Sequence, residues 1–127
     1  MPAVVAVAPD LYFAARISAL ARAAGVDVTF ETPARAFALC ASEPPALLLL
    51  DLHAPDDAAT LVRAIKSDPR ARAARIVGFY SHVETGLRRA VLAAGIDEAL
   101  PRSAFVARLP ALLERAAGGA GGERASS

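Results

Sequence analysis

Four consecutive leucines at residues 47–50 form the most apolar stretch of the chain, and they run directly into Asp51. Pro44 and Pro45 precede this run and Pro55 follows it, which leaves little room for a helix. A short apolar run bounded in this way is typical of a strand that is buried on both faces of a parallel sheet. Functional groups in open parallel sheets gather beyond the carboxyl ends of the strands, so Asp51 is a candidate functional residue.

On both sides of this strand, β-prone runs alternate with stretches of helical periodicity. Further strands are expected at residues 3–8, 26–30, 75–80 and 96–100. Helices are expected at residues 11–24, 33–41, 58–67, 84–94 and 103–117, the last of them interrupted or bent near Pro110. Five strand–helix pairs with short connections predict an α/β, flavodoxin-like fold: a doubly wound, five-stranded parallel sheet of order 2-1-3-4-5 with helices on both faces.

The length of 127 residues predicts a single domain. We place it at residues 1–117, because the sequence GGAGGERASS at 118–127 cannot bury enough apolar surface to fold and is expected to be a disordered tail. Hydrophobic residues make up 55% of the chain, but no run approaches the roughly 20 residues that span a bilayer. The N-terminus lacks the basic start of a signal peptide, and Cys40 has no partner for an internal disulfide. These features predict a cytoplasmic protein without a membrane partner.

The formal net charge of +1 gives no general attraction to nucleic acid. The basic residues between the third helix and the fourth strand are expected to form a solvated connection; they are Lys66, Arg70, Arg72 and Arg75. Nucleic-acid binding would need a larger one-sided field or a reading helix, and neither is evident. We therefore predict no nucleic-acid partner.

Four separated segments converge in the predicted topology, and this convergence is the main functional signal. The order 2-1-3-4-5 brings the ends of the first and third strands together, so Asp10 would lie across from Asp51. Ser81 and Arg102 follow the fourth and fifth strands and would lie on the neighbouring rim.

With Asp51 in LLLLDLHAP and Ser81 in FYSH, residues 3–117 resemble the receiver domain of bacterial two-component response regulators. The resemblance implies that Asp51 occupies the position of the phosphoacceptor and that Ser81 contacts the phosphoryl oxygens. It also implies a signalling module rather than an enzyme, which docks through its fourth helix, fifth strand and fifth helix.

The sequence departs from this family at three places. The acidic pair that normally binds Mg²⁺ is replaced by Ala8 and Pro9, with Asp10 one place later; Arg102 stands where a lysine is usual, and Ala99 where an aromatic switch residue is usual. Mg²⁺ prefers several oxygen ligands in octahedral geometry, so Asp10 and Asp51 are only weak candidate ligands and no cofactor is predicted. Arg102 keeps a positive charge and could form a standing ion pair with Asp51.

These departures favour a degenerate receiver, or pseudoreceiver. In this interpretation the chain is a stand-alone signalling module that binds a protein partner, such as a histidine kinase or another signalling protein, or a second copy of itself. Mg²⁺-dependent phosphorylation would be weak or absent. The alternative is an ordinary response-regulator receiver that is phosphorylated on Asp51.

Other residues on the same rim allow minor alternatives. His53 and His82 could join Asp51 in a transition-metal site. A nucleophilic triad of Ser81, His82 and Asp51 is less favoured, because adjacent residues in an extended segment point apart. Tyr12 lies among three successive large residues at a helix start that cannot all face one core, so at least one of them should be exposed or lie over the pocket.

Overall fold

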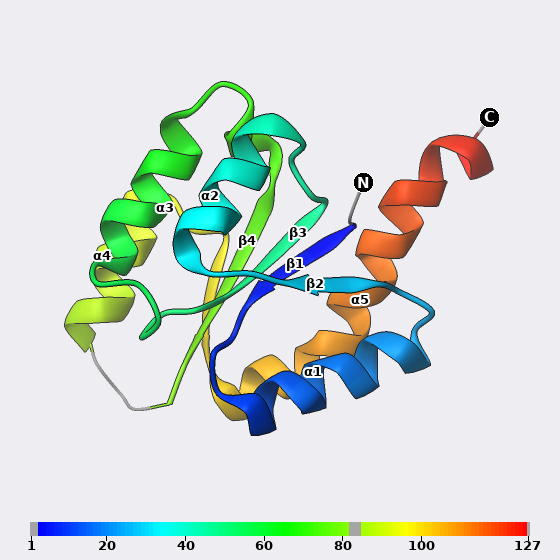
Figure 1. Ribbon diagram of the computed structural model, residues 1–127, viewed down its shortest axis with the longest axis horizontal. Coiled ribbons are helices and arrows are strands. Elements are labelled where there is room, and N and C mark those ends of the chain that lie inside the picture. Colours follow the sequence, from blue (N-terminus) through cyan, green and yellow to red (C-terminus); the bar gives the residue numbers. More distant parts are fainter. Residues whose placement is uncertain (1–2, 82–84, 127) are drawn as a thin grey trace.

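The computed structural model describes residues 3–81 and 85–126 and shows a parallel sheet between two layers of helices (Figure 1). The sheet has five strands in the order β2-β1-β3-β4-β5, and every neighbouring pair is parallel. The strands are β1 (Val4–Val7), β2 (Val28–Phe30), β3 (Leu47–Asp51), β4 (Arg75–Tyr80) and β5 (Glu98–Pro101). This confirms the predicted flavodoxin-like fold and its strand order.

The helices divide between the two faces of the sheet. They are α1 (Leu11–Ala23), α2 (Pro33–Ser42), α3 (Ala58–Ser67), α4 (Thr85–Ala94) and α5 (Arg102–Ser126). Helices α1 and α5 cover one face, and α2, α3 and α4 cover the other (Figure 1). A short 3-10 helix, η1 (Ala71–Ala73), connects α3 to β4 and was not predicted.

Strand β3 lies at the centre of the molecule, and all five of its residues are buried. Leu48 and Leu50 belong to the core under α2, α3 and α4, whereas Leu47 and Leu49 belong to the core under α1 and α5. Each leucine that is removed from water contributes about 1.5–3 kcal/mol of hydrophobic stabilisation. The apolar run is therefore a doubly covered strand, as its pattern predicts.

Local signals fix the ends of several helices. Pro33 opens α2, and the Thr32 hydroxyl accepts a hydrogen bond from the Arg35 N–H at 3.3 Å. Gly25, after α1, has a φ of +70°, and Gly95, after α4, has a φ of +104°. Glycine adopts this left-handed conformation without the strain that other residues meet there, and it ends both helices near the predicted positions.

Helix α5 is continuous at Pro110, so the predicted interruption is absent, and the alternative of a bend near Pro110 stays a prediction. Pro110 has no N–H to donate to the Val106 carbonyl. Because Pro110 is exposed, that carbonyl lies on the solvent side of the helix rather than inside the core. The helix extends to Ser126 instead of ending near residue 117. The division into a domain at 1–117 and a tail at 118–127 stays a prediction.

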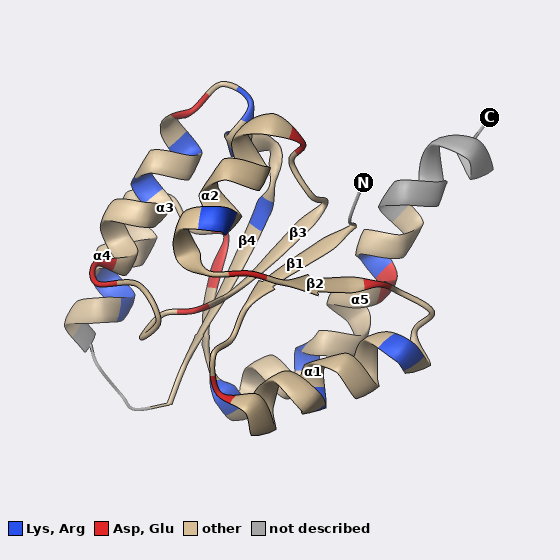
Figure 2. Ribbon diagram, in the orientation of Figure 1, with Lys and Arg blue, Asp and Glu red and all other residues tan. Residues whose placement is uncertain are grey.

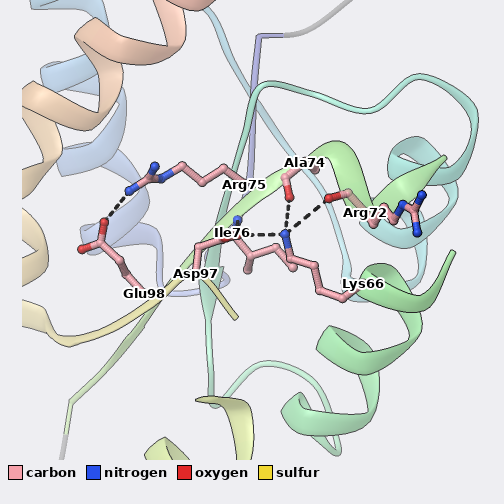
Figure 3. Close-up of polar contacts among 7 residues, drawn as sticks. All are labelled: Lys66, Arg72, Ala74, Arg75, Ile76, Asp97 and Glu98. Atoms are coloured by element: carbon pink, nitrogen blue, oxygen red, sulfur yellow. Dashed lines mark hydrogen bonds and ion pairs between the residues drawn. The ribbon is translucent and has the colours of Figure 1, made fainter. Parts of the chain in front are cut away.

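Two of the basic residues that we expected to be solvated hold the amino ends of β4 and β5 together (Figure 3). The Lys66 ammonium lies 2.8 Å from the Asp97 carboxylate and donates to the Ala74 carbonyl at 2.9 Å. The Asp97 carboxylate also accepts the Ile76 N–H at 2.7 Å. Arg75 donates to Glu98 at 2.7 Å. The simple solvated interpretation was wrong for Lys66 and Arg75, because sequence spacing did not show which carboxylates the sheet brings beside them.

Within the described residues, no helix is both long enough and apolar enough to cross a membrane.

Candidate functional site

The carboxyl edge of the sheet brings together residues from three distant segments. Asp51 is the last residue of β3, Asp10 lies in the connection from β1 to α1, and Arg102 is the first residue of α5. The Arg102 guanidinium lies between the two carboxylates: its Nη1 is 3.5 Å from Asp10 Oδ2, and its Nη2 is 3.9 Å from Asp51 Oδ2. The predicted convergence of Asp10, Asp51 and Arg102, including the ion pair between Arg102 and Asp51, is present in the structure.

Asp51 is the one buried charged residue in the described part of the chain, with 6% of its surface exposed. Its Oδ1 accepts the backbone N–H of His53 at 2.9 Å, and its Oδ2 faces Arg102. A buried carboxylate is tolerated when hydrogen bonds and an opposite charge replace its lost hydration. Each of the two oxygens of Asp51 has such a partner.

The two carboxylate oxygens of Asp10 also have different partners. Its Oδ1 caps α1 by accepting the backbone N–H groups of Tyr12 at 2.9 Å and Phe13 at 3.2 Å, while its Oδ2 faces Arg102. The pKa of Asp10 is lowered, mainly by the Phe13 N–H and further by the Tyr12 N–H and the positive charge of Arg102. Asp10 is therefore a helix cap and an ion-pair partner at once.

Arg102 rests on an aromatic surface. Its guanidinium carbon lies 4.4 Å from the ring centre of Phe13 and 5.9 Å from that of Phe79, both within the range of cation–π attraction. The ring centres of Phe13 and Phe79 are 4.8 Å apart, and Phe105 supports Phe79 at 4.5 Å. The rings thus lie under the guanidinium while the carboxylates approach its nitrogens.

The position of Arg102 at the start of α5 makes these contacts necessary. A helix N-terminus carries a partial positive charge, so a cation there is unfavourable unless it is compensated. Asp10 and Asp51 supply that compensation. The Arg102 Nε is buried and has no hydrogen-bond partner among the described residues, which is consistent with a side chain held by stacking and by its two terminal nitrogens.

Of the other predicted rim residues, Ser81, His53 and Tyr12 lie within the described part of the chain. Ser81 directly follows β4 and is exposed, and the described contacts of the Arg102 cluster do not include it. His53 contacts Asp51 through its backbone N–H, and His82 lies outside the described residues. Tyr12 is 82% exposed beside the exposed Leu11, whereas Phe13 is buried. The expectation that these three large residues could not share one core is confirmed.

The donor set at this edge does not fit Mg²⁺. The described residues contain no group of three or more His, Cys, Asp or Glu side chains that could hold a metal ion. Among the described residues, the carboxylates that face Arg102 are those of Asp10 and Asp51, and each already has one oxygen on backbone N–H groups and the other facing the guanidinium. Mg²⁺ needs near-octahedral oxygen coordination, and a fixed positive charge stands where it would have to bind.

Sequence reasoning missed the roles of Phe13 and Phe79. Phe13 lies in the predicted first helix and Phe79 in the predicted fourth strand, and the sequence assigns neither a role at the site. The available signal was that each lies within three residues of a candidate rim residue: Phe13 follows Asp10 by three, and Phe79 precedes Ser81 by two. That spacing alone does not reveal contact with a side chain from α5.

Charged residues do not gather on one element. Figure 2 shows Lys and Arg on each of the five α-helices, whereas the described Asp and Glu residues lie mostly in loops and strands, with Glu114 on α5.

Solved structures with this fold are numerous. The receiver domain of a sensor histidine kinase from Pseudomonas aeruginosa, which holds a magnesium ion in its active-site cleft, is 23% identical, with a TM-score of 0.77 over 92% of this chain and 98% of that domain. The phosphorylated cyanobacterial phytochrome response regulator RcpA is 17% identical, with a TM-score of 0.74 over 92% of this chain and 91% of that one. A response regulator from Thermotoga maritima is 21% identical, with a TM-score of 0.70 over 91% and 93% of the two chains. The chain thus has the fold of response-regulator receiver domains.

No protein-family model matches the sequence, and no curated protein matches it significantly.

Proposed function

We propose that this protein is a receiver-like signalling module that acts through protein–protein interaction, with weak or absent Mg²⁺-dependent phosphorylation of Asp51. The observation that carries the proposal is the position of Arg102, whose guanidinium is shared by Asp10 and Asp51 at 3.5 and 3.9 Å. The receiver fold supports a role in signalling, and the altered pocket supports weak or absent Mg²⁺-dependent phosphorylation.

Phosphoryl transfer to an aspartate needs a free oxygen lone pair in line with the phosphorus and cations that neutralise the equatorial phosphoryl oxygens. The Oδ1 of Asp51 is directed to the His53 N–H, and its Oδ2 faces Arg102. The charge of Arg102 is already used on two carboxylates. A phosphodonor would therefore have to compete with the Asp51 carboxylate for the positive charge of Arg102.

Transmission of a phosphorylation signal would also differ from that of the family. Ala99, at the position where the resemblance leads us to expect an aromatic switch residue, is 4% exposed within the core against α3 and α4. A buried methyl group has no alternative rotamers that could report on the pocket. We infer a protein that presents one surface to its partner rather than one that alternates between two.

The partner is a protein, either a histidine kinase, another signalling protein or a second copy of this chain. Leu11 and Tyr12, 84% and 82% exposed at the start of α1, place two large side chains directly after Asp10, and such side chains often anchor interfaces. We propose a cytoplasmic location and no enzymatic activity.

An ordinary phosphoacceptor receiver is the second candidate. It is favoured by one feature, the presence of Asp51 and Ser81 at the ends of adjacent parallel strands β3 and β4. In that case Arg102 would move aside and contact the phosphoryl group.

Intact-mass measurement after incubation with acetyl phosphate and Mg²⁺ separates the two functions. We expect at most a minor adduct on the wild-type protein, so that the fraction of adduct differs little from that in Asp51→Asn. A stoichiometric adduct that disappears in Asp51→Asn would establish the ordinary receiver instead.

A further inference from the structure

We infer that the guanidinium of Arg102 is the built-in cation of this pocket, standing in the place of a divalent metal ion, and that Phe13 is the positioning residue that holds it there. The inference deepens the proposed function, on which it rests for its consequence in signalling, because it supplies the physical reason for weak phosphorylation.

Asp10, in the connection after β1, and Asp51, at the end of β3, both face Arg102, and like charges at this edge need a shared cation. The two terminal nitrogens of Arg102 serve one carboxylate each, Nη1 toward Asp10 and Nη2 toward Asp51. A planar fork can bridge two carboxylates in this way, whereas the compact ammonium of lysine acts as a point charge.

Phe13 contacts both members of the Asp10–Arg102 pair. The guanidinium carbon is 4.4 Å from the ring centre of Phe13, and Phe13 is also the residue whose backbone N–H is bound by the Asp10 carboxylate at 3.2 Å. One residue therefore orients both members of the Asp10–Arg102 pair: its N–H fixes the carboxylate and its ring fixes the cation. Phe79 extends the same surface at 5.9 Å.

Arginine suits position 102 better than lysine would. Guanidinium stacks flat on a ring and is more weakly hydrated than ammonium, so it tolerates the partly buried position better. The Arg102 Nε faces the interior without a hydrogen-bond partner among the described residues, and stacking on Phe13 and Phe79 is the contact that remains for this part of the side chain.

NMR of the labelled protein tests the positioning role directly. Ring currents should shift the Arg102 side-chain resonances of the wild type away from random-coil values. Phe13→Leu, which keeps an apolar side chain without a ring, should return them toward those values. Phe105→Leu is the matched control, because Phe105 belongs to the same aromatic cluster but has no described contact with Arg102. Random-coil shifts in the wild type, or an unchanged Arg102 spectrum in a folded Phe13→Leu variant, would overturn the inference.

Paramagnetic broadening by Mn²⁺ tests the cation role without relying on the folding of a core variant. The amide resonances of Asp51 and His53 should not broaden selectively in the wild type. Arg102→Gln should raise the affinity for Mn²⁺ at this edge by at least about tenfold, because a unit positive charge near two carboxylates is removed. Selective broadening in the wild type, or no gain of affinity in Arg102→Gln, would contradict the cation role. If the wild type binds no Mn²⁺ but is phosphorylated stoichiometrically, the cation role stands and the proposed function alone is overturned.

Discussion

Asp10 and Arg102 lie 92 residues apart in the sequence, yet Asp10 Oδ2 and Arg102 Nη1 are 3.5 Å apart in the structure. Because the Oδ1 of the same carboxylate caps α1, this contact joins the first turn of α1 to the first turn of α5. The carboxyl edge of the sheet is therefore tied together by an arginine and two carboxylates.

Substitution of Asp10 should separate its two roles. Asn keeps a side-chain oxygen that can cap α1 but removes the negative charge, whereas Ala removes both. We expect the unfolding midpoint in urea to fall in the order wild type, Asp10→Asn, Asp10→Ala. Equal midpoints for the Asn and Ala variants would show that capping by Asp10 contributes nothing measurable.

The stability of the protein should fall as acid protonates three carboxylates that accept backbone N–H groups. The pKa values of Asp10, Asp57 and Asp68 are all lowered from the ordinary 3.8, chiefly by hydrogen bonds from the backbone N–H groups of Phe13, Thr60 and Ala71, respectively. A carboxyl group whose folded-state pKa is lowered stabilises the fold above its unfolded pKa, and loses that contribution as the pH falls through the folded value.

Urea denaturation across the acid range measures this dependence. The free energy of unfolding should decrease as the pH drops below about 3.8, and the decrease should be smaller in Asp57→Asn, which keeps the cap but cannot titrate. An Asp57→Asn variant with the same acid dependence as the wild type would contradict the role of Asp57.

Gly78 should not tolerate a side chain. A Cβ added at this position of β4 would lie 2.6 Å from Leu52 Cδ2 and 2.9 Å from Ile96 Cδ1, inside the core under α3 and α4. Overpacking of this kind destabilises a protein by about 1–3 kcal/mol, and we expect a loss of that size for Gly78→Ala in urea denaturation.

Gly86 provides the matched control. It lies in α4, and a Cβ there would meet none of the described atoms within 4 Å. Gly86→Ala should leave stability unchanged or raise it by up to about 1 kcal/mol, because alanine favours a helix over glycine. A loss at Gly86 as large as that at Gly78 would mean that general glycine effects, rather than the Leu52 and Ile96 contacts, explain the result.

Cys40 should be unreactive in the folded protein. Its side chain is fully buried, and burial raises the pKa of the thiol to about 11. Because the thiolate is the nucleophile, iodoacetamide at mildly alkaline pH should label Cys40 only after the protein is unfolded in urea. Mass spectrometry measures the labelling. Rapid labelling of the native protein would show that α2 opens easily.

The sheet order and the positions of Asp10, Asp51 and Arg102 could be predicted because each depends on strong local signals. The four leucines, the prolines and the helix-ending glycines locate the elements, and parallel topology then brings the strand ends together. The aromatic support of Arg102 could not be predicted in this way. Phe13 and Phe79 have the same apolar periodicity as any core residue, and their contact with Arg102 depends on the packing of α5 against α1. The same applies to Lys66, whose partner Asp97 is identified only by the pairing of β4 with β5.

The central claim is that Arg102, rather than a divalent metal ion, neutralises the Asp51 pocket. It is tested most directly by the intact mass of the wild-type protein after incubation with acetyl phosphate, once with Mg²⁺ and once with EDTA. We predict the same low level of adduct in both samples, because Mg²⁺ finds no site beside Arg102. A stoichiometric adduct on Asp51 that forms with Mg²⁺ and is abolished by EDTA would contradict the claim.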